Sequence, residues 1–185
     1  MRKVVFALLV ISLGLSIFSC SSNNQAVESD GDLVYRPPWW GSQEEPEFIY
    51  TYGQGTNLAE NSSMNSARAN ALQEAANYVE VEVQSMIKNF EEEAGINDPQ
   101  VLSLTSSVVR AVANAKFSGV VTGKVETRRI NERGGVRYKT WMQLKIPRDQ
   151  VNKNLVETIR NEETLYNQFK ASQAFQELDK QLDRY

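Results

Sequence analysis

The chain has 185 residues, contains no histidine and only one cysteine, and carries a formal net charge of −3. This length suits one domain of ordinary size. The absence of histidine excludes the common catalytic triads, and the acidic balance argues against a nucleic-acid partner.

The first residues have the layout of a secretory signal peptide. Met1-Arg2-Lys3 gives a positive start, and the stretch from Val4 to Ile17 is almost wholly apolar. A helix over this stretch would be about 21 Å long, which is shorter than the roughly 30 Å hydrocarbon core of a bilayer. We therefore expect residues 1–19 to be a removable leader rather than a transmembrane helix, and their removal takes the net charge to −5.

Cys20 follows the leader directly. Ile17-Phe18-Ser19-Cys20 resembles a bacterial lipobox, which predicts that Cys20 becomes a lipidated N-terminus. A lone exported thiol with no second cysteine to pair with is otherwise hard to explain, although an export signal with an incidental cysteine is the alternative. Two or more acyl chains give stable membrane attachment, so membrane lipid is the expected partner. By the known sorting pattern, Ser21 points to the outer membrane.

A polar segment then leads into the folded domain. Residues 20–36 cannot build a core and predict a flexible tether. Pro37-Pro38 stiffens the chain, and Trp39 and Trp40 follow. Adjacent side chains of an extended segment point in opposite directions, so one tryptophan is expected in the core and one at its edge. The alternative is an exposed aromatic contact for lipid, glycan or a partner.

The next elements are a strand and a long helix. Residues 47–53 read as a strand, and Gly53-Gln54-Gly55 predicts a tight turn after it rather than a phosphate loop. Residues 62–94 have the three-four alternation of an amphipathic helix, with Ser62 as the expected N-cap and small residues early on the apolar face. A strand over residues 78–83 is the rival interpretation. The apolar face is expected to comprise Met64, Ala67, Ala71, Leu72, Ala75, Tyr78, Val79, Val83, Met86, Ile87 and Phe90.

The second half of the chain predicts two further helices around a hairpin. Asp98 and Pro99 start a helix over 99–115, residues 116–146 form the hairpin, and one long helix covers 149–183. We expect Gly119 and Gly123 either to let the long first helix come close or to mark a bulge. Beyond Ala171 the last helix either leaves the domain to pair with another subunit or packs on its own domain.

One face of the second hairpin strand is predicted to be exposed to solvent. Arg137, Lys139, Trp141, Gln143 and Lys145 alternate with apolar residues, as in an antiparallel sheet with helices on one side only. The predicted class is therefore α+β, with a small antiparallel sheet packed against the helix over 62–94. We divide the chain into a leader (1–19), a tether (20–36), an α+β domain (37–160) and a helical extension (161–185).

Several short motifs carry a family resemblance. They are Pro38-Trp39-Trp40, Tyr52-Gly53-Gln54-Gly55, the alanines at 67, 71 and 75, and the segment Tyr138 to Leu144. Together they resemble the twenty-kilodalton lipoprotein family of bacterial envelopes, which includes FlgP-type flagellar lipoproteins, and the N-terminal module of FlgT-type flagellar proteins. The resemblance implies an outer-membrane lipoprotein with a small α+β domain and no known catalysis, some members of which assemble around the flagellar motor.

These patterns favour a non-catalytic, membrane-anchored module for structure or assembly, without a cofactor or metal. Its expected partners are membrane lipid at Cys20, together with a second copy or another envelope protein. The three adjacent acidic residues Glu91-Glu92-Glu93 splay around a helix and cannot converge on a substrate or a metal ion. The alternative function is binding of peptidoglycan, glycan or anionic lipid. Its predicted surface comprises Trp39, Trp40, Trp141, Arg137 and Lys139.

Overall fold

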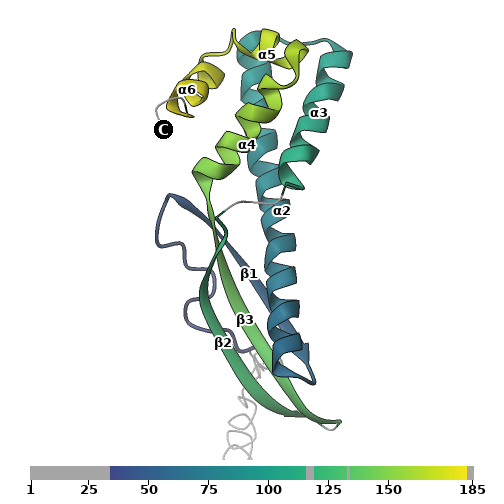
Figure 1. The fold of residues 1–185 in the computed structure, drawn as a ribbon, viewed down its shortest axis with the longest axis vertical. Helices are drawn as coiled ribbons and strands as arrows, with labels where there is room; N and C mark the ends of the chain where they lie inside the picture. Colours follow the sequence, from purple (N-terminus) through teal and green to yellow (C-terminus); the bar gives the residue numbers. More distant parts are fainter. Residues whose placement is uncertain (1–33, 116–118, 133, 183–185) are drawn as a thin grey trace, which may run out of the picture. The chain divides into compact units, whose positions relative to one another are not determined.

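The computed structural model describes residues 34–115, 119–132 and 134–182. The chain divides into two compact units, Met1–Tyr35 and Arg36–Tyr185, and every helix and strand described here belongs to the second. The predicted α+β class is confirmed, because an antiparallel sheet packs against separate helices (Figure 1). The elements are β1 Phe48–Asn57, α2 Glu60–Ala94, α3 Pro99–Ala113, β2 Val121–Glu132, β3 Gly135–Pro147, α4 Arg148–Arg160, α5 Glu163–Phe169 and α6 Gln173–Leu182.

The sheet has three antiparallel strands in the order β1-β3-β2. The predicted hairpin is confirmed as β2 and β3, and β1 pairs along the other side of β3. β1 is longer than expected, because the chain stays extended to Asn57. The glycine pair at 53 and 55 therefore lies inside the strand, and the predicted tight turn there is wrong.

The backbones of β1 and α2 approach so closely that only glycine fits between them. A Cβ atom on Gly53 would lie 2.0 Å from the Ala67 carbonyl oxygen and 2.9 Å from the Ala71 Cβ. A Cβ atom on Gly55 would lie 2.5 Å from the Ser63 carbonyl oxygen. Small residues on both partners thus set the distance between helix and sheet.

The two glycines that the sequence suggested for this role lie elsewhere. The bulge alternative is confirmed at Gly123, because the register of β2 against β3 shifts between Thr122 and Val125. A Cβ atom on Gly123 would meet the Gln143 Oε1 at 2.5 Å. Gly119 has a φ of +73° just before β2, a conformation that glycine adopts easily.

The start of α2 is tied to the sheet by hydroxyl groups. The helix begins at Glu60, and Ala59 rather than Ser62 is its N-cap, so the predicted cap is wrong. The buried Ser63 Oγ donates to the Gly55 carbonyl oxygen at 2.9 Å and lies 2.8 Å from the Thr140 Oγ1. These bonds satisfy polar atoms in a contact that excludes water.

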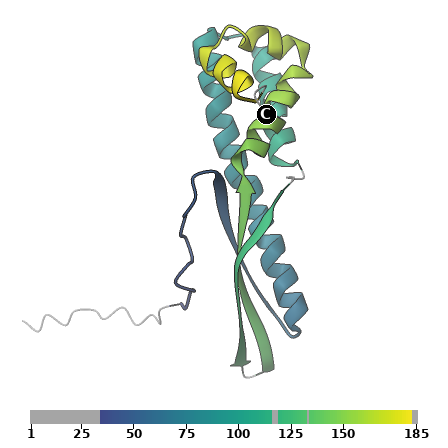
Figure 2. The same ribbon diagram turned by 60° about the vertical axis from the view of Figure 1, so that its left-hand side comes forward.

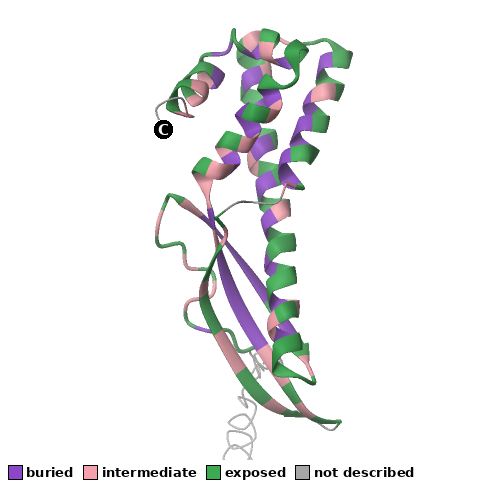
Figure 3. Ribbon diagram, viewed as in Figure 1, coloured by how far each residue is buried: buried purple, intermediate pink, exposed green. Residues whose placement is uncertain are grey.

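One winding stripe of buried side chains on α2 packs against both the sheet and the layer of helices. The 35 residues of α2 span about 52 Å, and the rival strand interpretation of residues 78–83 is wrong. A four-residue step turns a helix about 40° beyond a full turn, so a stripe with that repeat winds around the axis. Its first half faces β1 and β3, and its second half faces the helices (Figures 1 and 3). The buried residues are Ser63, Ala67, Ala71, Ala75, Val79, Val83, Ile87 and Phe90.

The winding also corrects the predicted apolar face. Leu72 and Tyr78 were expected to be buried, but they are 37% and 40% exposed. A straight stripe drawn at three-four spacing includes them, whereas the observed stripe has not yet turned to the direction of Leu72 and has already turned past that of Tyr78. The large side chains of the second half join the core of the helical layer.

The C-terminal end of α2 and the start of α3 follow the sequence. Gly95 closes α2 in the left-handed conformation with a φ of 68°. Asp98 caps α3, because its carboxylate accepts a hydrogen bond from the Gln100 N–H at 2.8 Å, and Pro99 is the first helical residue. The predicted helix over 99–115 is therefore confirmed within two residues.

The C-terminal segment is not the single long helix predicted over 149–183. It breaks near Asn161 and again near Ser172 into α4, α5 and α6. The break at Ser172 folds α6 back, and Phe175 becomes 1% exposed, with its ring 5.5 Å from that of Phe90. Of the two alternatives for this segment, packing on its own domain is the one observed.

A carboxylate on α2 holds the second break. The Glu93 Oε2 accepts hydrogen bonds from the Ser172 Oγ at 2.7 Å and from the Ala174 N–H at 2.9 Å. The bond from the Ala174 backbone is the main cause that lowers the pKa of Glu93, followed by the bond from Ser172. The contribution of this carboxylate to stability is therefore present above the ordinary glutamate pKa and is lost as the pH falls through the lowered value.

Replacing Gly53 by alanine should weaken the fold, because the new methyl group would enter the α2 backbone. We expect a loss of about 2–3 kcal/mol in the free energy of unfolding, measured by urea denaturation and circular dichroism. Gly134→Ala is the matched control, since a Cβ atom there meets nothing within 4 Å. Equal midpoints for the two variants would contradict the close contact of β1 and α2.

Candidate functional site

The predicted surface residues lie on the face of the sheet that points away from α2. Met142 and Leu144 of β3 pack with Ala67 and Ala71 of α2, so the alternate residues of β3 point the other way. Those alternate residues are Arg137, Lys139, Trp141, Gln143 and Lys145. The structure thus brings three of the five predicted binding residues to one face.

An N-terminal segment crosses this face. We call residues 36–47 the strap, and Figure 2 shows it on the opposite side of the sheet from α2. The Trp40 ring lies 5.2 Å from the Tyr52 ring of β1, and the Arg36 guanidinium lies 5.6 Å from the Trp40 ring. The strap joins β1 through Glu47, whose carbonyl oxygen accepts a hydrogen bond from the Arg148 N–H at 2.9 Å.

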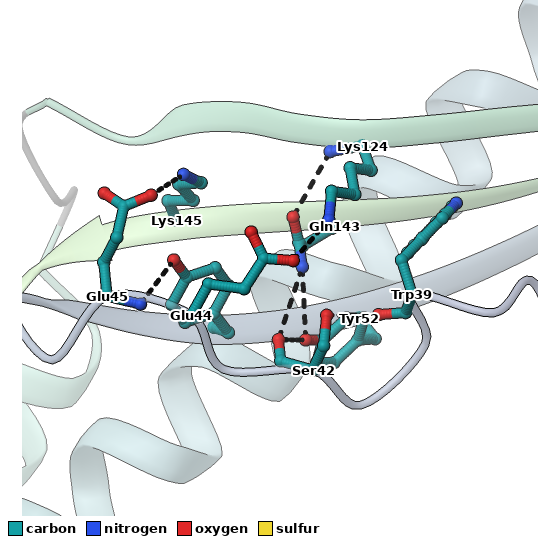
Figure 4. A network of polar contacts seen from close by, with 9 residues as sticks. Trp39, Ser42, Glu44, Glu45, Tyr52, Lys124, Gln143 and Lys145 are labelled. Atoms are coloured by element: carbon teal, nitrogen blue, oxygen red, sulfur yellow. Dashed lines mark hydrogen bonds and ion pairs between the residues drawn. The ribbon is translucent and has the colours of Figure 1, made fainter.

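A buried glutamine fastens the strap to the sheet. The Gln143 Nε2 donates to the Tyr52 hydroxyl at 3.2 Å and to the Ser42 carbonyl oxygen at 3.5 Å (Figure 4). The Tyr52 hydroxyl itself donates to the same carbonyl oxygen. The Gln143 Oε1 accepts a hydrogen bond from the Lys124 N–H at 3.3 Å, in the bulge of β2. One side chain therefore connects β1, β2, β3 and the strap.

Two ion pairs flank this glutamine. Glu44 pairs with Lys124, and the Glu45 Oε1 lies 2.5 Å from the Lys145 Nζ (Figure 4). Hydrogen bonding and attraction to Lys124 lower the pKa of Glu44, and the hydrogen bond to Glu45 raises the pKa of Lys145. The stabilising effect of Glu44 is lost as the pH falls through its lowered pKa, whereas that of Lys145 is lost as the pH rises through its raised pKa.

The structure separates the predicted binding residues by exposure. Trp141 is only 2% exposed, so the expectation of an exposed tryptophan there is wrong. Trp39 and Trp40 are both half-buried, with ring centroids 6.3 Å apart, rather than one buried and one at the edge. Lys139 lies over the Trp141 ring at 5.0 Å, and Arg137 is exposed. Cys20, the predicted lipidation site, lies outside the described residues.

The face is covered because the strap returns over it, which the alternation of β3 alone does not reveal. The sequence nevertheless held a signal, since Tyr50, Tyr52 and Trp141 all fall on the supposedly wet face. Three aromatic side chains on one face indicate that something covers it. Gln143 and Ser42, which fasten the cover, were missed because their partners lie far away in the sequence.

A groove lies on another part of the domain. It has a volume of about 440 Å³ and runs between α2 and α3, with Ile87 and Val109 among its lining residues and Glu80, Glu91, Lys88 and Arg110 at its sides. Within the described ranges, no three histidine, cysteine or acidic side chains come together as a metal site, and no helix has the length and hydropathy to cross a membrane. The candidate site on the sheet consists of aromatic, amide and paired charged groups.

Replacing Gln143 by leucine should loosen the strap, because the Ser42 carbonyl oxygen and the Lys124 N–H would lose a buried partner. We expect a loss of about 1–3 kcal/mol in the free energy of unfolding and faster proteolysis before Phe48. Gln54→Leu makes the same change at an exposed position of the same face. If both variants resist protease like the wild type, Gln143 does not hold the strap.

No family model, curated protein or solved structure matches this chain.

Proposed function

We propose that the chain is a lipid-anchored protein of the bacterial outer membrane, and that its folded unit is a non-catalytic module for structure or assembly. The observation that carries the proposal is the order of its parts. A short apolar leader ends at the only cysteine, a polar spacer follows, and the folded unit begins with the strap. An acylated Cys20 would hold the unit to the membrane through this spacer.

The spacer and the strap suit a tether. As a random coil, residues 21–36 would reach roughly 20–24 Å, on a scale of 5–6 Å times the square root of the length. The strap that follows is bonded to all three strands through Gln143 and its two flanking ion pairs. A force applied to the spacer would therefore be transmitted to the sheet through several hydrogen bonds and ion pairs at once. We call the face of the sheet that the strap crosses the strap face. In this proposal its polar groups have a mechanical role and bind neither a cofactor nor a substrate.

One observation favours the alternative function of binding peptidoglycan, glycan or anionic lipid. Trp39 and Trp40 are half-buried, and Arg36 lies against the Trp40 ring. Arg137 is exposed, and its strand presents this side chain on the face that the strap crosses. Aromatic rings beside cations suit sugars and anionic groups.

The anchor is tested by replacing Cys20 with serine. Because the thiol is the acceptor for the lipid, we expect the variant to lose incorporation of radiolabelled palmitate and to leave the outer-membrane fraction. Ser21→Ala is the control and should stay labelled and membrane-bound. A wild-type protein that carries no acyl group by intact-mass measurement would end the proposal.

The binding alternative is tested by sedimentation of the detergent-solubilised chain with purified peptidoglycan at several salt concentrations. If the strap face binds peptidoglycan, Arg137→Glu should lower the pelleted fraction several-fold, because the substitution replaces a positive charge by a negative one. Salt should weaken the binding of the wild type, because it screens attraction between exposed charges. Arg129→Glu makes the same charge change at the β2 position opposite Tyr138, on the other face. Equal pelleting of both variants and the wild type would reject this alternative.

A further inference from the structure

The two edges of the sheet are treated differently. An edge strand offers backbone N–H and C=O groups to any strand that comes near. α2 closes the β1 edge, because the Glu74 Oε2 accepts a hydrogen bond from the Tyr52 N–H at 2.9 Å and the Asn70 Nδ2 donates to the Gln54 carbonyl oxygen at 2.7 Å. β2 forms the other edge.

The first part of β2 carries a backbone irregularity that opposes edge pairing. The bulge lies between Thr122 and Val125, and within it the Lys124 N–H bonds to the Gln143 side chain. From Val125 to Glu132 the strand pairs with β3 in one unbroken register. Val125 itself is 40% exposed. This second part is long and regular enough to accept another strand.

The sequence of this part is complementary to itself in the antiparallel direction. If two copies of β2 align with Thr127 opposite Thr127, Glu126 of each copy lies opposite Arg128 of the other. The symmetry makes this pair twice, and opposite charges at directly opposed positions stabilise an antiparallel pair. Moving the two-fold axis by one residue, to Glu126 or to Arg128, would instead place that charged side chain opposite its own copy, which is destabilising.

The surroundings of Arg128 also favour the pairing of Glu126 with Arg128 between two copies. Within its own sheet Arg128 lies directly opposite Lys139, which places two cations side by side. Inside one chain the Arg128 Nε donates to the Glu126 Oε1 at 2.7 Å, a contact along the same strand. A second copy would place its own Glu126 opposite Arg128, which adds an acidic side chain beside the two cations Arg128 and Lys139.

We propose that the β2 edge is the docking surface for a second copy of this chain, paired antiparallel about a two-fold axis at Thr127. The two sheets then continue as one, and the interface is isologous. This inference rests on the proposed assembly function and names its partner and its surface. Anchoring both copies to one membrane would raise their effective concentration and favour a pairing that is weak in dilute solution.

The charge match is tested with the full lipidated chain in detergent, by analytical ultracentrifugation. Glu126→Arg and Arg128→Glu each place like charges opposite one another twice per dimer, so each should raise the dissociation constant about tenfold or more. The double swap restores both pairs and should return the constant to that of the wild type. A monomeric wild type, or single swaps that leave the dimer unchanged, would overturn the proposal.

A second variant tests the axis in intact cells. Opposed residues of an antiparallel pair have Cα atoms about 4.5–5.5 Å apart, which is within the range for a disulfide. Since Cys20 is the only native cysteine and is acylated in the proposed function, Thr127→Cys should give a disulfide-linked dimer of the chain. Thr56→Cys, at an exposed position on the β1 edge, is the control and should remain monomeric.

The outcomes separate this inference from the proposed function. Palmitate labelling of these variants reports the anchor independently of the dimer. A labelled chain whose Thr127→Cys variant forms no disulfide-linked dimer, or links to a different protein, overturns the self-pairing and leaves the anchor in place. An unlabelled chain that still dimerises through Thr127→Cys overturns the anchor alone.

Discussion

The close contact between β1 and α2 sets the dimensions of the sheet-facing half of the domain. At Gly53 and Gly55 a single Cβ atom would enter the helix backbone, and the helix has the small residues Ala67 and Ala71 at this contact. Close approach excludes water, so the buried hydroxyl of Ser63 must find partners inside the contact, which it does at Gly55 and Thr140. The packing of the sheet against α2 therefore depends on residues chosen for the absence of side-chain volume.

The same helix then supports a second layer. Because its buried positions recur every four residues from Ser63 to Ile87, the stripe turns steadily, and Phe90 near the far end contacts the rings of Phe169 and Phe175. The α5–α6 segment is held there by the Glu93 carboxylate. Sheet and helical layer thus share one continuous support, and Ile49 and Ile146 of the sheet join the core of the helical layer.

The strap gives the sheet a second cover and links the fold to the proposed anchor. The buried Gln143 bonds to a segment that lies about a hundred residues earlier in the chain. The strap lies on one face of the sheet and α2 packs on the other. α2 side chains close the β1 edge, whereas β2 forms the other edge of the sheet.

The sequence by itself determined the α+β class, the hairpin, α2 and the capped start of α3, because these depend on local periodicity and on residues such as Asp98, Pro99 and Gly95. It also fixed the features at Cys20 on which the anchor proposal rests. Tertiary structure alone decided that Gly53 and Gly55 are packing residues, that Gln143 fastens a covering segment and that the C-terminal helix breaks at Ser172. Each of these depends on a partner distant in sequence, namely α2, the strap and Glu93, and local patterns carry no information about such partners.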